Sequence, residues 1–237
     1  MNYEYRDSCL IYFGEKDEAV SLKDVKESRY SMSLQNIVQD HGLEQLVVLN
    51  QIHSSIGLCV DEISRQQRSS WFEASGDFLV TNQKNIALLV LTGDCIPLTL
   101  YDPVQHAVAL VHAGWKGAYS GVVQQALQML QQKYGTQPQD VIGTFGPSAR
   151  SCCYEVSLQF MNDFNVKYPD IAMFVQRGSR WYFDNSLFLQ QILKKFGIMT
   201  HNIQVSSALC SICNVQFCSF RREKESAGRQ VTMVALR

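Results

Sequence analysis

Residues 86–117 have the sequence IALLVLTGDCIPLTLYDPVQHAVALVHAGWKG, and this stretch decides the class of fold. It contains three apolar runs, Ile86–Leu91, Ile96–Tyr101 and Ala107–Val111, with turn-forming residues between them. Short, mostly apolar runs bounded by turns are typical of β-strands that are covered on both faces. We therefore predict three successive buried strands in this part of the chain.

Apolar runs on either side of this stretch predict further strands, and a period of 3.6 residues predicts helices. The additional strands are Cys9–Phe13, Leu46–Ile52, Ile56–Val60, Asp77–Thr81, Val141–Phe145, Ile203–Ser206 and Val231–Leu236. The clearest helix follows Gly117, where one apolar stripe contains Val122, Val123, Ala126, Leu127, Leu130 and Tyr134. Other helices are predicted at Ser33–His41, Ser157–Tyr168 and Ser186–Phe196, each beside a Ser or Asn that can cap it.

The order of these elements predicts the architecture. Strands that cluster between widely spaced helices indicate an α/β (α+β) fold, with mixed β-sheets flanked by helices. No internal repeat and no linker rich in Pro, Gly or Ser divides the sequence. Residues 1–237 are therefore expected to form a single compact domain.

Composition and charge exclude several classes of partner. The chain has 21 Lys and Arg against 22 Asp and Glu, a net charge of -1, which argues against nucleic acid as a ligand. No apolar stretch approaches the roughly 20 residues that span a bilayer. The N-terminal residues show no export signal, so we expect a cytoplasmic protein that acts on small molecules and binds neither nucleic acid nor membrane.

Eight cysteines are the unusual feature of the composition. In a reducing compartment each is a small buried hydrophobe, a metal ligand or a nucleophile. Cys210 and Cys213 have C-x-x-C spacing, but no second pair follows at zinc-finger spacing, although Cys218 could join them. Cys152 and Cys153 are adjacent, which suits chelation poorly. We expect these two pairs to be structural.

Three segments place a metal-binding residue type at the end of a predicted strand. They contribute His53, Cys95 and His112. A His/Cys/His set is the ligand chemistry of a catalytic zinc, which keeps its fourth position open. Spacing alone favours the alternative that the three residues are unrelated. Asp94 favours the metal site, because a carboxylate beside a potential thiolate can orient a ligand or move a proton.

Two further segments are candidates for binding an anion. Gly114, Trp115, Lys116 and Gly117 join a buried strand to the glutamine-rich helix, and the two glycines allow close approach of a phosphate beside the lysine. The alternative is an ordinary turn with a solvated lysine. Phe217–Arg222 carries the pair Arg221 and Arg222, which could meet an anionic group or lie in a solvated mixed-charge loop.

Together these segments form an ordered series of motifs. They are Gln51-Ile52-His53, Asp77-x-Leu79-Val80-Thr81, Leu91-Thr92-Gly93-Asp94-Cys95-Ile96-Pro97, Val111-His112-Ala113-Gly114-Trp115-Lys116-Gly117, Gly146-Pro147 followed by Tyr154-Glu155-Val156, and Ser219-Phe220-Arg221-Arg222 with Gly228-Arg229. The series resembles the YfiH-type family, also called the laccase-domain or multicopper polyphenol oxidoreductase family and described as purine nucleoside phosphorylases. The resemblance runs from about Leu46 to the C-terminus.

The resemblance implies a metal site and an activity. It implies a compact α/β protein in which His53, Cys95 and His112 hold a zinc ion. It also implies phosphorolysis of adenosine, inosine, guanosine and methylthioadenosine, and deamination of adenosine. We therefore expect a purine nucleoside and phosphate as substrates. Asp94, Cys95 and His112 are the expected catalytic residues.

The residues expected to bind the substrate or phosphate follow from the same hypothesis. They are Gly114, Trp115, Lys116, Gly117, Arg221 and Arg222. The zinc would act as a template and charge stabiliser, and Asp94 would move a proton.

Three alternatives to this function stay open. The same ligands accept Cu²⁺, which would suit a copper-dependent polyphenol oxidase, but five histidines in the whole chain are too few for a multicopper centre. A second alternative is a catalytically impaired metal-binding member of the family. The third is an enzyme that edits peptidoglycan precursors.

The sequence departs from the family near its N-terminus. Members carry an Arg-x-Gly-Gly-x-Ser segment whose arginine reaches the active site, but Ile11–Val20 contains neither an arginine nor a glycine pair. Arg150 is a candidate for the substitute positive charge. This departure keeps the impaired-member alternative open.

Overall fold

The structure is a computed structural model that describes residues 2–5, 8–20, 39–63, 74–205 and 209–237. Most of the predicted helix Ser33–His41 lies outside these residues, as does the last residue of the predicted strand Ile203–Ser206. No helix in the described part of the chain is long and apolar enough to cross a membrane.

A six-stranded mixed sheet forms the centre of the molecule. Its order is β13 (Ile203–Val205), β9 (Ile142–Phe145), β7 (Ile96–Asp102), β8 (Ala107–Ala113), β5 (Phe78–Thr81) and β4 (Gly57–Cys59). The outer pairs β13–β9 and β4–β5 are parallel, and the inner pairs are antiparallel. The sheet therefore mixes both kinds of pairing, as the predicted α/β architecture requires.

A five-stranded sheet packs beneath the first. Its order is β1 (Asn2–Tyr5), β2 (Cys9–Phe13), β14 (Gln230–Leu236), β6 (Ile86–Thr92) and β3 (Gln45–Val48). Side chains from both sheets, among them Leu88, Leu110 and Val234, form one buried cluster between them. The chain crosses from this sheet to the central one between β6 and β7, so Gly93–Cys95 forms the connection.

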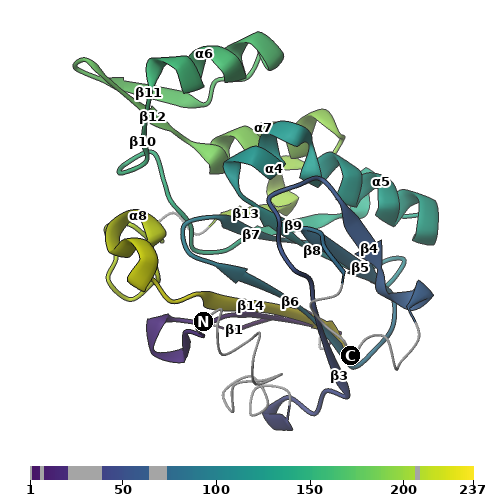
Figure 1. Ribbon diagram of the computed structural model, residues 1–237. Helices are drawn as coiled ribbons and strands as arrows, with labels where there is room; N and C mark the ends of the chain where they lie inside the picture. Colours follow the sequence, from purple (N-terminus) through teal and green to yellow (C-terminus); the bar gives the residue numbers. More distant parts are fainter. Residues whose placement is uncertain (1, 6–7, 21–38, 64–73, 206–208) are drawn as a thin grey trace.

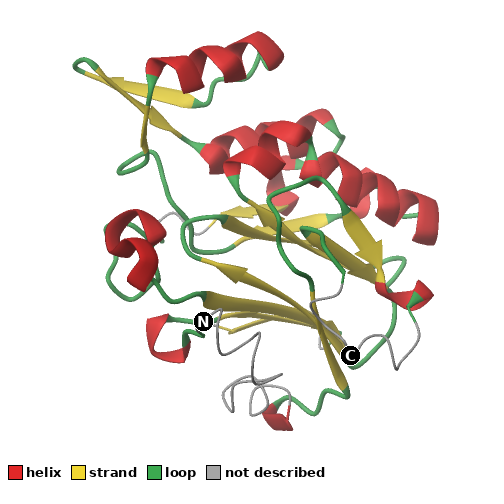
Figure 2. Cartoon of the chain, in the orientation of Figure 1, coloured by secondary structure: helices red, strands yellow, loops and turns green. Residues whose placement is uncertain are grey.

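Helices cover the other face of the central sheet (Figure 1). They are α4 (Trp115–Ser120), α5 (Val122–Tyr134) and α7 (Asn185–Lys195). The buried side of α5 consists of Val122, Val123, Ala126, Leu127 and Leu130, which is the apolar stripe predicted from the sequence. Figure 2 shows the resulting order of helices, central sheet and second sheet.

A smaller unit projects beside these layers. It contains a three-stranded sheet in the order β10 (Glu155–Val156), β12 (Arg180–Phe183) and β11 (Phe174–Arg177), with α6 (Leu158–Lys167) against it. Phe160, Phe164 and Phe183 pack together with ring centroids 4.8–5.2 Å apart. The remaining short elements are α8 (Phe220–Glu223) and the 3-10 helices η1 (Lys16–Glu18), η2 (Val60–Glu62), η3 (Pro138–Asp140), η4 (Thr200–Asn202) and η5 (Lys224–Ser226).

The structure confirms the predicted strands, with shifted bounds, and corrects some local expectations. The strand predicted over Leu46–Ile52 ends at Val48, so His53 lies in a loop and not at a strand end. Every residue of β6, β7 and β8 is buried, as expected for strands covered on both faces. The N-cap of α7 is Asp184, whose side chain accepts from Leu187, and not the predicted Asn185. Residues 220–223, expected in a mixed-charge loop, form a helical turn because Ser219 caps it and accepts from the Arg222 amide.

Candidate metal centre

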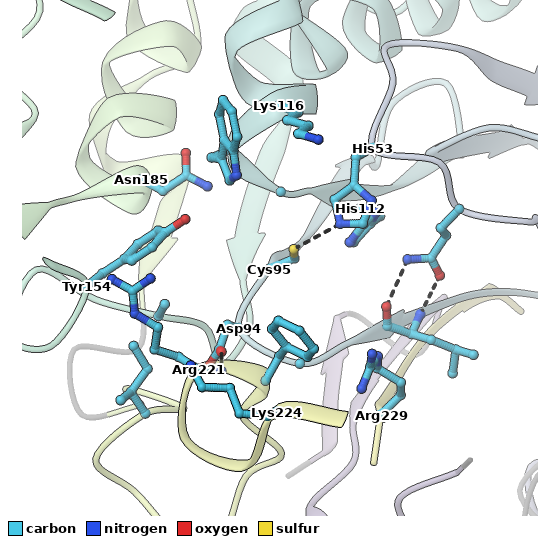
Figure 3. Close-up of a pocket in the computed structure, with 18 of the residues that line it drawn as sticks. His53, Asp94, Cys95, His112, Lys116, Tyr154, Asn185, Arg221, Lys224 and Arg229 are labelled. Atoms are coloured by element: carbon cyan, nitrogen blue, oxygen red, sulfur yellow. Dashed lines mark hydrogen bonds between the residues drawn. The ribbon is translucent and has the colours of Figure 1, made fainter. Parts of the chain in front are cut away.

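Three chain segments bring His53, Cys95 and His112 together. His53 lies in the loop between β3 and β4, Cys95 ends the β6–β7 connection, and His112 lies in β8. Pairing of β7 with β8 sets Pro97 opposite His112, which brings Cys95 alongside that histidine. The donor atoms of the three residues all lie within 4.8 Å of one another, and Cys95 Sγ lies 3.8 Å from His53 Nε2. Figure 3 shows the thiol beside both imidazoles.

This donor set fits a single metal ion. Zinc binds imidazole nitrogen at about 2.0–2.1 Å and thiolate sulfur at about 2.3 Å, and catalytic sites use three protein ligands. His112 Nδ1 lies 2.8 Å from Asp77 Oδ1, so Nδ1–H donates to the carboxylate and Nε2 is left to coordinate. A carboxylate–histidine pair of this kind is the usual support of a ligating imidazole.

Asp77 organises the centre beyond this one contact. It lies directly before β5 and is almost fully buried. Its carboxylate accepts the backbone amides of His53 at 2.9 Å and Ser54 at 2.5 Å, and the Ser54 hydroxyl at 2.7 Å. The carboxylate therefore fixes the His53 loop and the His112 ring together. The sequence analysis listed Asp77 in a family motif and missed this role.

The electrostatics of the centre favour the charged forms of Cys95, His112 and the Asp77 carboxylate. Burial raises the pKa of the Cys95 thiol, but the His112 charge and hydrogen bonds from both imidazoles outweigh it and lower this pKa to about 6. Burial likewise lowers the pKa of His112, but the Cys95 thiolate and the Asp77 carboxylate together raise it to about 9. Against burial, hydrogen bonds from His112 and Ser54 lower the pKa of Asp77. Without metal, Cys95 is thus a thiolate and His112 an imidazolium at neutral pH, so a metal ion that binds Cys95 must also displace the Nε2 proton of His112.

Two close approaches require small residues near the ligands. A Cβ atom on Gly114 would lie 2.8 Å from His53 Cδ2 and 2.9 Å from Cys95 Sγ. A Cβ atom on Gly117 would lie 2.8 Å from the Ser54 carbonyl oxygen. The loop that carries His53 therefore packs directly on the start of α4.

A pocket of about 550 Å³ opens at the centre. Lys116, Arg221, Lys224 and Arg229 supply positive charge to its wall. Three of these cations make cation–π contacts, at 5.4–5.9 Å from the ring centroids. Lys116 lies over Trp115, Arg221 over Tyr154 and Arg229 over Phe220. The pocket thus combines metal ligands, cations and aromatic faces.

Asp94 lines this pocket in a left-handed backbone conformation, with φ of 87°. Its carboxylate accepts the Ser211 hydroxyl at 2.7 Å and the backbone amide of Arg221 at 2.6 Å. It therefore holds α8, and with it Arg221, at the edge of the pocket. The 3₁₀ helix η5 that follows contributes Lys224.

The expected binding residues separate into two groups. Gly114, Trp115, Lys116 and Arg221 line the pocket, but Gly117 and Arg222 do not. The Arg222 guanidinium instead donates to the carbonyl oxygens of Ser211, Ile212 and Phe217, which hold it in the loop before α8. Arg150 is also not among the lining residues.

Several lining residues were missed by the sequence analysis. Tyr154, Asn185, Lys224 and Arg229 all face the pocket. Asn185 is 4% exposed, and its Nδ2 donates to the Ala113 carbonyl oxygen at 3.0 Å. Its Oδ1 accepts no hydrogen bond within the described residues, which leaves a buried acceptor at the pocket wall. Tyr154 and Arg229 occur in the family motifs, so those motifs were the available signal.

Comparisons with known proteins identify the family of the chain. Residues 17–237 match the model of a family described as multi-copper polyphenol oxidoreductase laccase. A purine nucleoside phosphorylase of Borreliella burgdorferi is 30% identical over 231 residues, which cover 94% of this chain and 92% of the relative. A purine nucleoside phosphorylase of Clostridium acetobutylicum is 25% identical over 232 residues, covering 96% and 92%.

A solved structure shows the same fold. The Bacillus licheniformis hypothetical protein YfiH superposes with a TM-score of 0.81 at 24% identity, covering 97% of this chain and 93% of that one. The arrangement of two mixed sheets with helices on one face is therefore a shared architecture.

Replacing Asp77 tests its role as the support of the centre. Asp77→Asn removes the negative charge and places an amide against His112, so we expect zinc affinity to fall about 10–100-fold. A competition titration with a chromophoric zinc chelator measures this affinity. Asp61→Asn is the matched control, because Asp61 accepts from Thr81 and Tyr134 outside the centre. Equal zinc affinity in the wild type and Asp77→Asn would contradict the assignment.

Replacing Gly114 tests the packing of the ligands. Gly114→Ala places a methyl group against His53 and Cys95, so the ligands must separate and zinc affinity should fall by at least about 10-fold. Gly93→Ala is the control, because its Cβ would meet other atoms no closer than 3.5 Å. The same titration compares the two variants. Unchanged affinity in Gly114→Ala would show that the ligand spacing is not set by this contact.

Proposed function

The chain belongs to the multi-copper polyphenol oxidoreductase laccase family, and from this membership we propose that it is a zinc-dependent purine nucleoside phosphorylase. The observation that carries the proposal is the pocket that joins the His53, Cys95 and His112 donors to four cationic side chains and three aromatic rings. Relatives that cover nearly the whole chain carry the name purine nucleoside phosphorylase, which supports the same activity.

The cations suit a phosphate. Lys116, Arg221 and Arg229 are placed around one pocket, and each can donate charge-assisted hydrogen bonds to phosphate oxygens. A planar guanidinium binds two oxygens at once, whereas Lys116 acts as a point charge. These side chains would hold phosphate beside the ligand cluster and neutralise its charge.

The aromatic rings suit the base. Trp115 and Phe220 are each exposed by about 40% at the pocket, which leaves ring surface free to stack on a purine. The Asn185 Oδ1 offers a buried acceptor for an N–H or O–H group of the nucleoside. A base on these rings and phosphate on the cations would place the ribose between them.

The reaction requires one bond to form and one to break. A phosphate oxygen attacks the anomeric carbon, the bond from that carbon to the purine nitrogen breaks, and the base leaves with its bonding electron pair and takes a proton. Lys116 and the arginines orient the nucleophile, which is the proximity effect that accelerates such displacements. When bound, the metal supplies Lewis-acid stabilisation of negative charge. Asp94 is our candidate for moving the proton.

Zinc is the metal we assign. Zinc binds both imidazole nitrogen and thiolate sulfur, and the Asp77 carboxylate behind His112 is the support that zinc-ligating histidines use. Copper accepts the same ligands, but a multicopper centre needs more imidazoles than His53 and His112 supply. The two groups of potential metal ligands found among the described residues contain no other histidine.

Product analysis tests the activity. Adenosine, inosine, guanosine and methylthioadenosine are expected to release the free base and a pentose 1-phosphate only when phosphate is present. Cys95→Ala and His112→Ala should lower this release by more than about 100-fold, because each removes a ligand of the centre. Lys133→Ala is the control, since Lys133 pairs with Glu62 and does not line the pocket.

Two outcomes of this assay would contradict the proposal, and a third would extend it. Base release that is independent of phosphate would indicate hydrolysis and would contradict phosphorolysis. Conversion of adenosine to inosine without phosphate would show the accompanying deaminase activity that the family resemblance also implies. Release that persists in Cys95→Ala would separate the activity from the metal centre.

The role of Asp94 can be separated from simple positioning. If Asp94 moves the proton, Asp94→Asn should lower kcat about 10²–10⁴-fold and remove one limb of the pH–rate profile. Ser211→Ala is the matched control, because it removes one hydrogen bond to Asp94 and keeps the carboxylate. A raised KM for phosphate with an unchanged pH profile in Asp94→Asn would show that Asp94 only holds Arg221 in place.

A further inference from the structure

Four cysteines outside the first centre form a second cluster. Cys152 and Cys153 lie in the turn between β9 and β10, and Cys210 and Cys213 lie in the loop between β13 and α8. Their sulfur atoms all lie within 4.8 Å of one another, and Cys152 Sγ lies 4.0 Å from Cys213 Sγ. The two pairs, expected to be separate structural cysteines, thus form one group, and Cys218 is not part of it.

The separations of the four sulfur atoms suit four ligands of one metal ion better than four unrelated thiols. In a tetrahedral tetrathiolate site with zinc–sulfur bonds of about 2.3 Å, neighbouring sulfurs are about 3.8 Å apart. The separations here, 4.0 Å between Cys152 Sγ and Cys213 Sγ and no more than 4.8 Å for any pair, are close to this value, so a small inward movement would close the site. All four are free thiols. Four thiols with this spacing meet the ligand count of a structural zinc site, which leaves no open position.

The loop around Cys210 is arranged to hold a thiolate. The Cys210 sulfur accepts backbone hydrogen bonds from Cys213, Arg150 and Ile212, and it is hydrogen-bonded to the Cys152 thiol. Amide donors directed at a buried sulfur stabilise its ionised form, which is the form that binds zinc.

Backbone hydrogen bonds join the two cysteine turns. The Ser148 amide donates to the Leu209 carbonyl oxygen at 3.3 Å, and the Ser211 amide donates to the Ser148 carbonyl oxygen at 3.0 Å. Ser148 and Cys210 therefore form a parallel bridge. The pairs are held at a fixed separation although they are far apart in the sequence. A rigid support of this kind is what metal ligands need.

Positive charges surround the cluster. A zinc ion with four thiolates carries a net charge of about -2, which needs compensation. The Arg150 guanidinium interacts electrostatically with Cys152 and Cys210. Arg177 Nη1 donates to the Cys152 carbonyl oxygen at 3.0 Å, and the Arg222 guanidinium donates to the carbonyl oxygens of Ser211 and Ile212. Arg150 and Arg177 can offset part of the excess charge, whereas Arg222 is already paired with Glu223.

We propose that Cys152, Cys153, Cys210 and Cys213 bind a structural Zn²⁺ ion that joins the two loops forming one wall of the pocket. Ile212 and Tyr154, each next to a cysteine of the cluster, both line that pocket. Ser211, between Cys210 and Cys213, donates to the Asp94 carboxylate. The ion would thus fix pocket residues without touching the substrate.

Metal content tests this second site independently of the proposed activity. Protein purified under reducing conditions should contain about two zinc ions per chain, one from each cluster. Cys213→Ala and Cys152→Ala should each contain about one, and so should Cys95→Ala, because it removes a ligand of the other centre. Cys218→Ala is the matched control and should keep both ions, since its thiol lies outside both groups. Cys213→His should also keep both, because histidine supplies a replacement donor.

Cobalt substitution identifies which cluster holds the ion. Co²⁺ added to the metal-free protein should give intense sulfur-to-cobalt charge-transfer absorption that is largely retained in Cys95→Ala and falls in Cys213→Ala to the weaker band of the single Cys95 thiolate. Circular dichroism checks that each variant is folded. Wild-type protein with one zinc, unchanged in Cys213→Ala, would overturn the proposal. So would an intact mass lower by two hydrogen atoms for each disulfide among these cysteines, with no metal at the cluster.

Discussion

The Asp77 carboxylate is the constraint on which the centre depends. It is buried between β5, β8 and the His53 loop, and its two oxygens bind the His112 ring, the amides of His53 and Ser54 and the Ser54 hydroxyl. A buried carboxylate is costly unless each oxygen is hydrogen-bonded. The same hydrogen bonds that stabilise its charge orient two metal ligands, so folding and site formation are one event here.

The buried strands could be predicted from residues 86–117 and the apolar runs on either side, because a short, uniformly apolar run indicates a strand that is covered on both faces. The pairing of the strands could not be predicted. β6 and β7 belong to different sheets although only Gly93–Cys95 separates them. The family motifs supplied His53, Cys95 and His112 as metal ligands. The β7–β8 register brings Cys95 beside His112, and the Asp77 carboxylate holds the His53 loop against them. The cysteine cluster could not be predicted, because it depends on the long-range bridge between Ser148 and Cys210. The exposed hairpin of β11 and β12 was missed because its strands are short and partly polar.

The first cluster of ligands lines the pocket, the second lies next to the lining residues Tyr154 and Ile212, and the two differ in chemistry. The first has three protein donors at the pocket, which suits a metal that meets substrate, and the second has four, which suits a structural ion. Asp94 connects them, because its carboxylate receives Ser211 from the cysteine loop and its neighbour in the chain is Cys95. Ile11–Val20 lacks the arginine that other family members bring to the active site. The positive charge of this pocket comes from Lys116, Arg221, Lys224 and Arg229.

The central claim is that one metal ion at His53, Cys95 and His112 faces the pocket that binds phosphate. Anomalous diffraction at the zinc edge, from crystals grown with phosphate, measures both parts of this claim together. We expect an anomalous peak bounded by His53 Nε2, Cys95 Sγ and His112 Nε2, with tetrahedral density for phosphate beside Lys116 and the arginines. No peak at these three atoms, or phosphate bound only away from the pocket, would contradict it.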